Sequence, residues 1–511
     1  MRFALPKSAA VLIAAALLTG LSSCSNMSDR KSNSADITES YTKQYEKIVY
    51  AYTAYDGIPE KKTLDSVEEA INAITRKKIG VEVELKPIAA ADYSSNVSLA
   101  LQDGEQIDIF ESIGDFNTFV SGNMAYDLTN MIDACTPETK KLIGEDLLSV
   151  CYKDGKLYGI PTYKPYAAAP MIVYRRDIAR KLGIDMSKVK SIHSLTEILE
   201  KVKKAYPDMA PLLPVQQGNS GVNLCIPEVD YLTDGVSSPK GVLMGGDMTV
   251  VDYYGTKEFA DLCRLARTWY NAGLILKDAA TTTNTVMELM ASDKGFCYIA
   301  NYNYPAADVP AVLEAQNNVP SLGAVQIGSA YITTDSINSL SWMISATSVN
   351  PVAALKFLNL TFTDKDIINL IIYGIEGRDY ILDEDGFVSY PNGKAAFGVP
   401  YNTQLNCGTL GNYFLMYPLA GTSKESVIWE KEQNKQAGKS PAMNFTFDSS
   451  PVRTEYTAVN NVISQYLPGL LCGSLDPETA VSEFEYKLHT AGLGNIITEK
   501  QKQLDKWLAG K

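Results

Sequence analysis

The feature that most constrains the fold is an alternation of short β-prone runs with amphipathic helical stretches near the start of the chain. Residues 48–52 are apolar and β-prone, and residues 64–74 then carry apolar side chains at steps of three and four, the spacing of one helix face. Two more strand-like runs follow at residues 81–85 and 107–110, separated by another helical stretch. This order predicts a parallel sheet with right-handed helical crossovers.

A second block of alternation lies further along the chain. Residues 171–174, 296–300 and 340–346 have the composition of buried strands, whereas residues 195–202 and 259–270 have the apolar spacing of helices. The sequence near the C-terminus predicts helices only. Since 511 residues exceed the ~250–300 that one hydrophobic core holds, we expect two α/β lobes with an added helical C-terminal part.

Charge and composition exclude several classes of function. The net charge of −13 argues against a nucleic-acid binder, because phosphate contacts need a basic surface. His193 and His489 are the only histidines. Two histidines argue against a zinc site built on imidazole and against Ser-His-Asp catalysis.

Known loop motifs fail as well. Residues 438–440 end like a phosphate-binding loop, but Gln433 stands where its first glycine belongs. Residues 383–386 place acids before a glycine without the other ligands of an EF-hand, which predicts an ordinary turn. Glu376 and Asp379 come nearest to a catalytic carboxylate pair. Nothing in the sequence requires an enzyme, a metal or a cofactor, and we predict none.

The first residues have the pattern of an export signal. Residues 1–23 begin with Arg2 and Lys7 and continue into a short apolar run, too short for a membrane span. The sequence before Cys24 resembles the bacterial lipobox, which predicts lipidation of that cysteine and a chain held at the outer face of the cytoplasmic membrane. Residues 24–44 are polar and predict a flexible tether.

Seven cysteines remain after Cys24, an odd number with no closely spaced pair. This pattern is neither a disulfide framework nor a metal cluster. Cys263 and Cys297 lie among apolar residues and predict small buried hydrophobes, while one or two disulfides stay open.

Aromatic and amide side chains gather directly after the strand-like runs. These clusters are residues 52–56, 111–112, 162–166 and 301–304, together with Asn338 and Trp342. In open α/β sheets ligands bind beyond the carboxyl ends of the strands. Aromatic rings cover the C–H face of a sugar while amides and carboxylates bind its hydroxyls, although any single tyrosine could also be a packing residue.

Several longer segments resemble the family 1 extracellular solute-binding proteins of ABC importers. The segments are residues 154–161 (DGKLYGIP), 171–177 (MIVYRRD), 181–184 (KLGI), 294–302 (KGFCYIANY), 350–359 (NPVAALKFLN) and 373–380 (YGIEGRDY). The last resembles a signature of the large lipoprotein branch, which carries an extra C-terminal segment of undefined role.

The resemblance implies a periplasmic-binding-protein-like fold, with two α/β lobes that close on a solute and are joined by crossings near residues 165–170, 320–335 and 375–405. We expect lobe one to comprise residues 45–165 plus about 335–375. Lobe two and the C-terminal segment would comprise residues 170–330 plus about 405–511. Relatives with this C-terminal segment bind carbohydrates, and the calcium loop of some of them has no counterpart in this sequence.

Candidate site residues follow from the clusters and the resemblance. Tyr55 and Asp56 would contact the solute from lobe one, with Glu111 accepting hydrogen bonds from its hydroxyls. Sugar-stacking and hydrogen-bonding candidates from the crossing and lobe two are Tyr163, Tyr166, Asn301, Tyr302 and Tyr304.

Two further candidates are ambiguous. Trp342 lies in a strand-like run and is either a ligand residue or part of the core. Arg378 either pairs with a uronic acid carboxylate or locks its own turn through Glu376 or Asp379.

The sequence therefore predicts a monomeric solute-binding lipoprotein that captures an oligosaccharide and delivers it to the membrane subunits of an ABC importer. The alternatives are a surface polysaccharide lyase or glycosidase, and a sensor or adhesin lipoprotein of the same fold. A peptide remains the alternative ligand.

Overall fold

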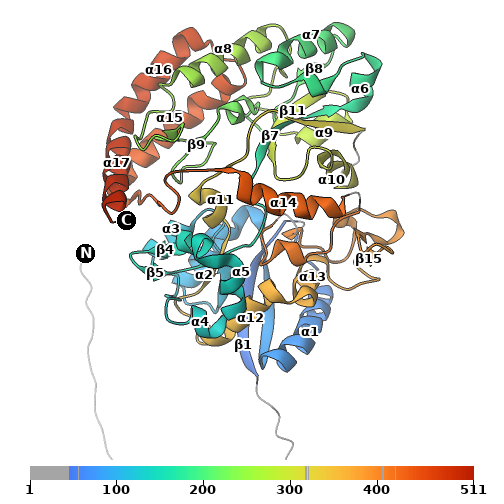
Figure 1. Cartoon of the computed structure of the whole chain (residues 1–511), viewed down its shortest axis with the longest axis vertical. Coiled ribbons are helices and arrows are strands. Elements are labelled where there is room, and N and C mark those ends of the chain that lie inside the picture. Colours follow the sequence, from blue (N-terminus) through green and yellow to red (C-terminus); the bar gives the residue numbers. More distant parts are fainter. Residues whose placement is uncertain are drawn as a thin grey trace, which may run out of the picture. The chain divides into compact units, whose positions relative to one another are not determined.

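The computed structural model describes residues 45–510 apart from residues 56, 317, 318, 320, 406, 407 and 421. In this range the chain builds two main β-sheets, each packed on a hydrophobic core (Figure 1). The predicted signal peptide, Cys24, the tether, Asp56 and Cys407 lie outside the described residues. Within the described part, no helix combines the length and apolarity needed to cross a membrane.

The first sheet contains the parallel strands that the sequence predicts. Its five strands are ordered β2 (Val81–Ala89), β1 (Glu46–Ala54), β3 (Ile109–Glu111), β14 (Ser341–Ile344) and β6 (Ile160–Pro161). β1 runs parallel to β2 and β3, whereas β14 runs antiparallel to β3 and β6. Seven consecutive residues of β1 are buried, as expected for a central strand covered on both faces.

Seven helices connect or cover these strands. They are α1 (Lys61–Lys78), α2 (Tyr93–Gln102), α3 (Phe116–Ser121), α4 (Ile132–Cys135), α5 (Pro137–Leu148), α12 (Pro351–Thr363) and α13 (Lys365–Tyr373). Pro351 is the first residue of α12, and the side chain of Asp364 caps α13, which Gly374 ends.

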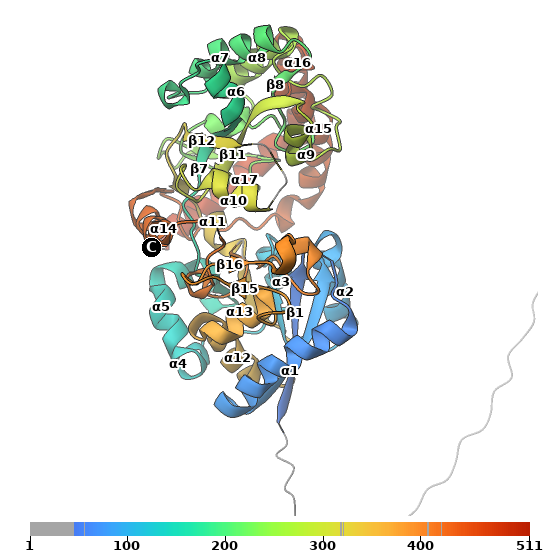
Figure 2. The same ribbon diagram turned by 90° about the vertical axis from the view of Figure 1, so that its right-hand side faces the viewer.

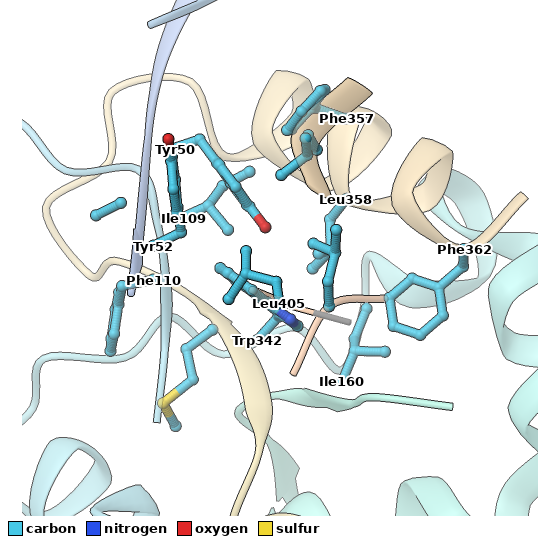
Figure 3. Packing of buried hydrophobic residues seen from close by; sticks show 14 of the residues in the cluster. Tyr50, Tyr52, Ile109, Phe110, Ile160, Trp342, Phe357, Leu358, Phe362 and Leu405 are labelled. Carbon is cyan, nitrogen blue, oxygen red and sulfur yellow. The ribbon is translucent and has the colours of Figure 1, made fainter. Parts of the chain in front are cut away.

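Aromatic side chains fill the centre of the first core (Figure 3). Trp342 is fully buried on β14, stacks on Tyr50 at 4.8 Å and meets no solvent. Its indole N–H donates to the carbonyl oxygen of Thr409 at 2.9 Å, and the ring of Phe357 packs edge-on against Tyr50. Of the two roles that the sequence left open for Trp342, the structure favours the core, because the side chain is fully buried.

The second sheet is mixed. Its strands are ordered β12 (Leu322–Gln326), β7 (Ala169–Arg175), β11 (Gly295–Tyr302) and β8 (Ala210–Leu212). β7 runs antiparallel to both neighbours, and only β8 and β11 are parallel. Alternate residues of β7 serve opposite faces: Ile172 joins one core, while Met171 and Val173 join a smaller cluster on the other side.

Helices of the second lobe come from two distant parts of the chain. The first set is α6 (Arg176–Lys181), α7 (Thr196–Ala205), α8 (Lys257–Asn271), α9 (Val286–Ala291) and α10 (Val309–Gln316). The second is the C-terminal set of α15 (Arg453–Leu471), α16 (Pro477–Thr490) and α17 (Leu493–Ala509). α15 and α16 pack on α8 (Figure 1), and buried residues such as Phe484 and Leu504 share one core with Trp269. The C-terminal helices are thus part of the second lobe's core.

The described chain passes between the two sheets three times. The first crossing is residues 162–168, the second is residues 327–340 with β13 (Tyr331–Ile332) and α11 (Thr334–Asn338), and the third is residues 422–444 with α14 (Lys424–Gln436) and β17 (Gly438–Lys439). α11 and α14 lie between the sheets in both views (Figures 1 and 2). β13 pairs in parallel with β17, and Ala168 forms a bridge with Tyr331, so the three crossings are hydrogen-bonded neighbours.

The third crossing differs from the predicted one at residues 375–405. That segment stays with the first core, where Tyr380, Val388 and Tyr401 are buried and where β15 (Ile381–Leu382) pairs with β16 (Val388–Ser389). Leu405 and Leu410 are buried there too, although we predicted that lobe two resumes near residue 405. The burial of these apolar side chains keeps the chain on lobe one until α14.

Six of the seven remaining cysteines are described, and all six are free thiols. Cys263 and Cys297 are buried, as predicted. Burial also raises the pKa of the Cys151 thiol to about 12, so this group stays protonated at neutral pH.

Trp342→Phe tests the assignment of this residue to the core. The substitution removes the buried hydrogen bond from the indole N–H to the Thr409 carbonyl and part of the packed ring, so we expect the free energy of unfolding to fall by about 1–3 kcal/mol. Urea unfolding measures this loss. The partly exposed Trp429 provides the control, since Trp429→Phe should change stability much less.

Candidate functional site

Strand ends from both sheets bring the predicted residues toward the crossings. β1 and β3 are parallel, so their carboxyl ends lie at one edge of the first sheet, where Tyr55 follows β1 with 43% of its surface exposed. In the second sheet the carboxyl end of β11 pairs with the start of β7, because Tyr302 lies opposite Ala169. The end of β11 therefore adjoins the first crossing.

A cavity of about 210 Å³ opens where β11 meets the crossings, and we call it the crossing pocket. Tyr166 and Tyr331 line it from the first and second crossings, and Asn301 lines it from β11. Another part of the wall is residues 224–229, Tyr231 and Val236, which include Glu228. Aromatic faces, an amide and a carboxylate thus border one concave space, a combination suited to a polar ligand with apolar patches.

Two of the predicted residues meet in this pocket, and two others lie elsewhere. Asn301 is exposed at the end of β11, while Tyr166 is largely buried and its hydroxyl donates to the Thr162 carbonyl. Tyr163 packs edge-on against Phe414 at 5.2 Å, outside the crossing pocket. Tyr302 pairs through its hydroxyl with that of Tyr298 at 2.7 Å.

Tyr304 lies in a different, smaller cavity against α14. Its neighbours there include Tyr413, Phe414 and Glu430. The hydroxyl of Tyr413 donates to Glu430 Oε1 at 3.2 Å, and burial raises the pKa of the Glu430 carboxyl to about 8. Tyr304 therefore contacts the third crossing.

A larger cavity of about 820 Å³ lies between α5 and α14 and touches Tyr163 and Tyr166. Leucine and isoleucine side chains form part of its lining. The strands that end there, β13 at Ile332 and β17 at Lys439, belong to the crossings, and no strand of the two main sheets ends in it. Because ligands of such sheets bind at strand ends, the crossing pocket is the better candidate.

Glu111 joins two strands. It is 1% exposed at the end of β3, and its Oε1 accepts a hydrogen bond from the Thr53 N–H of β1 at 2.7 Å. Its Oε2 has no hydrogen-bond partner among the described residues. Burial raises the pKa of this carboxyl to about 7.

Arg378 takes the second of its two predicted roles. Its guanidinium forms a fork on the buried Asp379 carboxylate, with Nε–Oδ1 2.9 Å and Nη2–Oδ2 2.6 Å, and Nη1 donates to Ser66. Asp379 Oδ2 also accepts from the Ile375 N–H at 2.8 Å. These bonds favour the turn-locking role over pairing with a sugar carboxylate, because the donors of Arg378 already hold the turn that begins at Gly374.

Residues 383–386 form the ordinary turn that the sequence predicts. Asp383 Oδ1 accepts hydrogen bonds from the N–H groups of Asp385 and Phe387, which closes the β15–β16 hairpin. No group of three or more potential metal-ligating side chains occurs among the described residues.

Sequence reasoning missed Tyr231, Tyr331 and Glu228. Tyr331 lies on a two-residue strand that exists only because β17 pairs with it, and no local pattern marks it. Glu228 has a left-handed backbone (φ 53°), which is uncommon for a residue with a side chain and has no sequence signal.

Comparison with known proteins identifies the family. Residues 69–372 match the family model described as bacterial extracellular solute-binding protein, and residues 441–509 match a domain of unknown function. A carbohydrate ABC transporter substrate-binding protein of Streptococcus pneumoniae is 24% identical over 501 residues, which cover 97% of each chain.

Solved structures show the same fold. The N-glycan transport solute-binding protein NgtS of S. pneumoniae has a TM-score of 0.79 at 23% identity, over 91% of this chain and 99% of that one. The alginate-binding protein AlgQ2 without calcium has a TM-score of 0.63 at 16% identity, over 90% and 97%. S. pneumoniae FusA in complex with kestose has a TM-score of 0.63 at 16% identity, over 91% of this chain and 100% of that one.

The chain belongs to the bacterial extracellular solute-binding proteins, since the family model spans more than half of it. The predicted family and the two-lobed, periplasmic-binding-protein-like fold are confirmed.

The raised pKa of Glu111 predicts how stability depends on pH. Between pH 4.5 and about 7 the folded state keeps the proton that the unfolded state releases, so this group's contribution to stability falls as pH rises through that window. Glu111→Gln has no titratable group at this position. Its free energy of unfolding should therefore fall by up to ~3 kcal/mol less than that of the natural chain over this pH range.

Urea unfolding at pH 4.5 and pH 7.5 measures the effect. The stability of Glu111→Gln relative to the natural chain should improve with pH, whereas Glu60→Gln, at an exposed acid, should show no trend. Parallel pH profiles for Glu111→Gln and the natural chain would contradict the assignment.

Proposed function

We propose that this protein captures an oligosaccharide between its two lobes and delivers it to an ABC importer. The observation that carries the proposal is the crossing pocket, in which Tyr166, Tyr331 and Asn301 meet where both lobes join. The carbohydrate named for the S. pneumoniae relative and the saccharides in the names of the similar structures support it.

The physical argument concerns the mixed polarity of a sugar. Tyrosine rings cover the C–H face of a pyranose, and the amide of Asn301 and the carboxylate of Glu228 pair with its hydroxyls. Closure of the lobes removes the sugar hydroxyls and the protein groups that bind them from water, which strengthens these hydrogen bonds. Binding of this kind needs no covalent chemistry, so we propose a binding protein without turnover.

The remaining predicted residues differ in whether we propose that they contact the solute. Tyr55 and Asp56 are proposed to contact the solute from lobe one. Tyr302 lies on the opposite face of β11 from Asn301 and pairs with Tyr298, so we propose that it supports the strand end rather than the pocket.

Tyr163 and Tyr304 already lie beside α14, so we propose that they contact only a solute that extends from the crossing pocket along this helix. The sequence predicts that Glu111 accepts hydrogen bonds from the solute's hydroxyls. Because it is 1% exposed and accepts from the Thr53 N–H, we propose instead that it positions the end of β1.

We also propose how the protein reaches its place of action. Residues 1–23 serve as the signal peptide, Cys24 carries the lipid, and residues 24–44 tether the folded lobes to the outer face of the cytoplasmic membrane. A monomer held there presents both lobes to the importer's membrane subunits.

Asn301→Ala tests the pocket. Thermal-shift and titration measurements use a panel of Man5GlcNAc, kestose, alginate oligosaccharides, monosaccharides and peptides. A ligand at 100 times its dissociation constant should add about 2.7 kcal/mol to the stability of the natural chain. Loss of the amide should weaken binding about tenfold, as one hydrogen bond of ~1–1.5 kcal/mol predicts.

Tyr486→Ala is the matched control, since this tyrosine is 73% exposed on α16. It should leave the affinity unchanged. Binding of peptides alone would overturn the carbohydrate ligand, and consumption of a saccharide would overturn the binding-protein proposal in favour of an enzyme.

Cys24→Ser tests the anchor. The natural chain should incorporate labelled palmitate and sediment with membranes, because the buried acyl chains hold it there. The variant should do neither, whereas Cys135→Ser should behave like the natural chain. Membrane association of Cys24→Ser equal to that of the natural chain would show that Cys24 is not the anchor.

A further inference from the structure

One wall of the crossing pocket is a loop that packs against the C-terminal helices. Residues 228–241, which we call loop 228–241, contribute Glu228, Val229 and Tyr231 to the pocket. On the side away from the pocket, the fully buried Lys500 of α17 reaches this loop. Its Nζ donates to Asp234 Oδ2 at 2.6 Å, to the Gly241 carbonyl at 2.9 Å and to the Tyr231 carbonyl at 3.5 Å.

The shape of loop 228–241 is not one that its own residues favour. Glu228, Leu232 and Thr233 have φ values of 53°, 48° and 75°, in the left-handed region that branched and bulky residues rarely adopt. Such a backbone persists only where surrounding contacts hold it. The contacts of Lys500 span the loop from Tyr231 to Gly241 and so meet this requirement.

Helix α15 holds the same loop at two more points. The hydroxyl of Tyr456 donates to Asp234 Oδ1 at 2.5 Å, so the Asp234 carboxylate is shared by α15 and α17. Ser238 donates to Asn460 Oδ1 at 2.6 Å. The backbone of Gly241 approaches α17 so closely that a Cβ there would lie 3.1 Å from Ile497 Cγ1.

The other edge of loop 228–241 touches the third crossing. Val229 and Leu232 are buried in the same hydrophobic cluster as Ala442 of the third crossing. The loop is therefore fixed between the C-terminal helices and one of the segments that join the lobes.

We propose that the C-terminal helices support the ligand pocket, and that Lys500 is the positioning residue through which they fix Tyr231 and Glu228 in the pocket wall. This inference rests on the proposed function of that pocket. It gives a role to residues 441–509, which match a domain of unknown function. An ammonium group suits the task because its three donors can bind three oxygens of one loop at once.

Lys500→Met in the full chain separates this role from general stabilisation. Hydrogen exchange of the ligand-free protein should become faster in residues 228–241, and the affinity for the panel member that the natural chain binds best, with Man5GlcNAc tried first, should fall about tenfold.

Two variants on the same helix are the controls. Lys502→Met removes a lysine that is 72% exposed and pairs with Glu499, and it should change neither measurement. Leu504→Ala removes a fully buried apolar side chain one turn further on, so it should lower the unfolding midpoint while the affinity stays unchanged.

Tyr456→Phe provides a milder test should Lys500→Met fail to fold. It removes only the hydroxyl that binds Asp234, and we expect a twofold to fivefold loss of affinity with faster exchange in the same loop, about what one hydrogen bond predicts. Faster exchange with unchanged affinity, or unchanged exchange in residues 228–241, would overturn the proposal. A natural chain that binds no saccharide would instead overturn the proposed function itself, whatever the exchange data show.

Discussion

The side-chain amide of Asn434 ties the first crossing to the third, and the arrangement of the candidate site depends on it. Its Oδ1 accepts hydrogen bonds from the N–H groups of Tyr166 and Ala167 at 2.7 and 3.1 Å, and its Nδ2 donates to the Lys164 carbonyl at 2.9 Å. Pairing of β13 with β17 adds the second crossing. Because of these bonds, pocket residues from distant parts of the chain share one small space.

Tyrosines serve three purposes in this protein, and burial decides which. Tyr50 and Tyr52 are fully buried in the first core, where Tyr52 places its hydroxyl 3.4 Å from that of Tyr401. Tyr166 and Tyr331 lie at the crossings, where part of the ring borders the pocket. Tyr456 holds a loop through its hydroxyl. A ring with one polar end suits all three environments, so tyrosine abundance alone does not locate a site.

Ion pairs with a buried partner fix geometry in this structure. The partly exposed Arg378 and the buried Asp379 lock a turn of the first lobe, and the buried Lys500 and Asp234 hold a loop of the second. Removing one partner of such a pair leaves an uncompensated buried charge, so each pair specifies a local conformation strongly. The C-terminal helices share the core of the second lobe and also supply one of these charges, which joins lobe stability to the shape of the pocket.

The sequence by itself determined the strands near residues 48–52, 81–85 and 107–110, the helices around residues 64–74 and 259–270, the family and the two-lobed fold. These features follow from local periodicity, capping and motifs, which depend only on residues that are close together in the chain. Only the tertiary structure decided that β7 runs antiparallel, that Trp342 is core, that Arg378 binds Asp379, and that Tyr231 and Tyr331 join Asn301. Strand direction, burial and the pairing of distant side chains arise from contacts between segments far apart in the chain, and local sequence does not encode them.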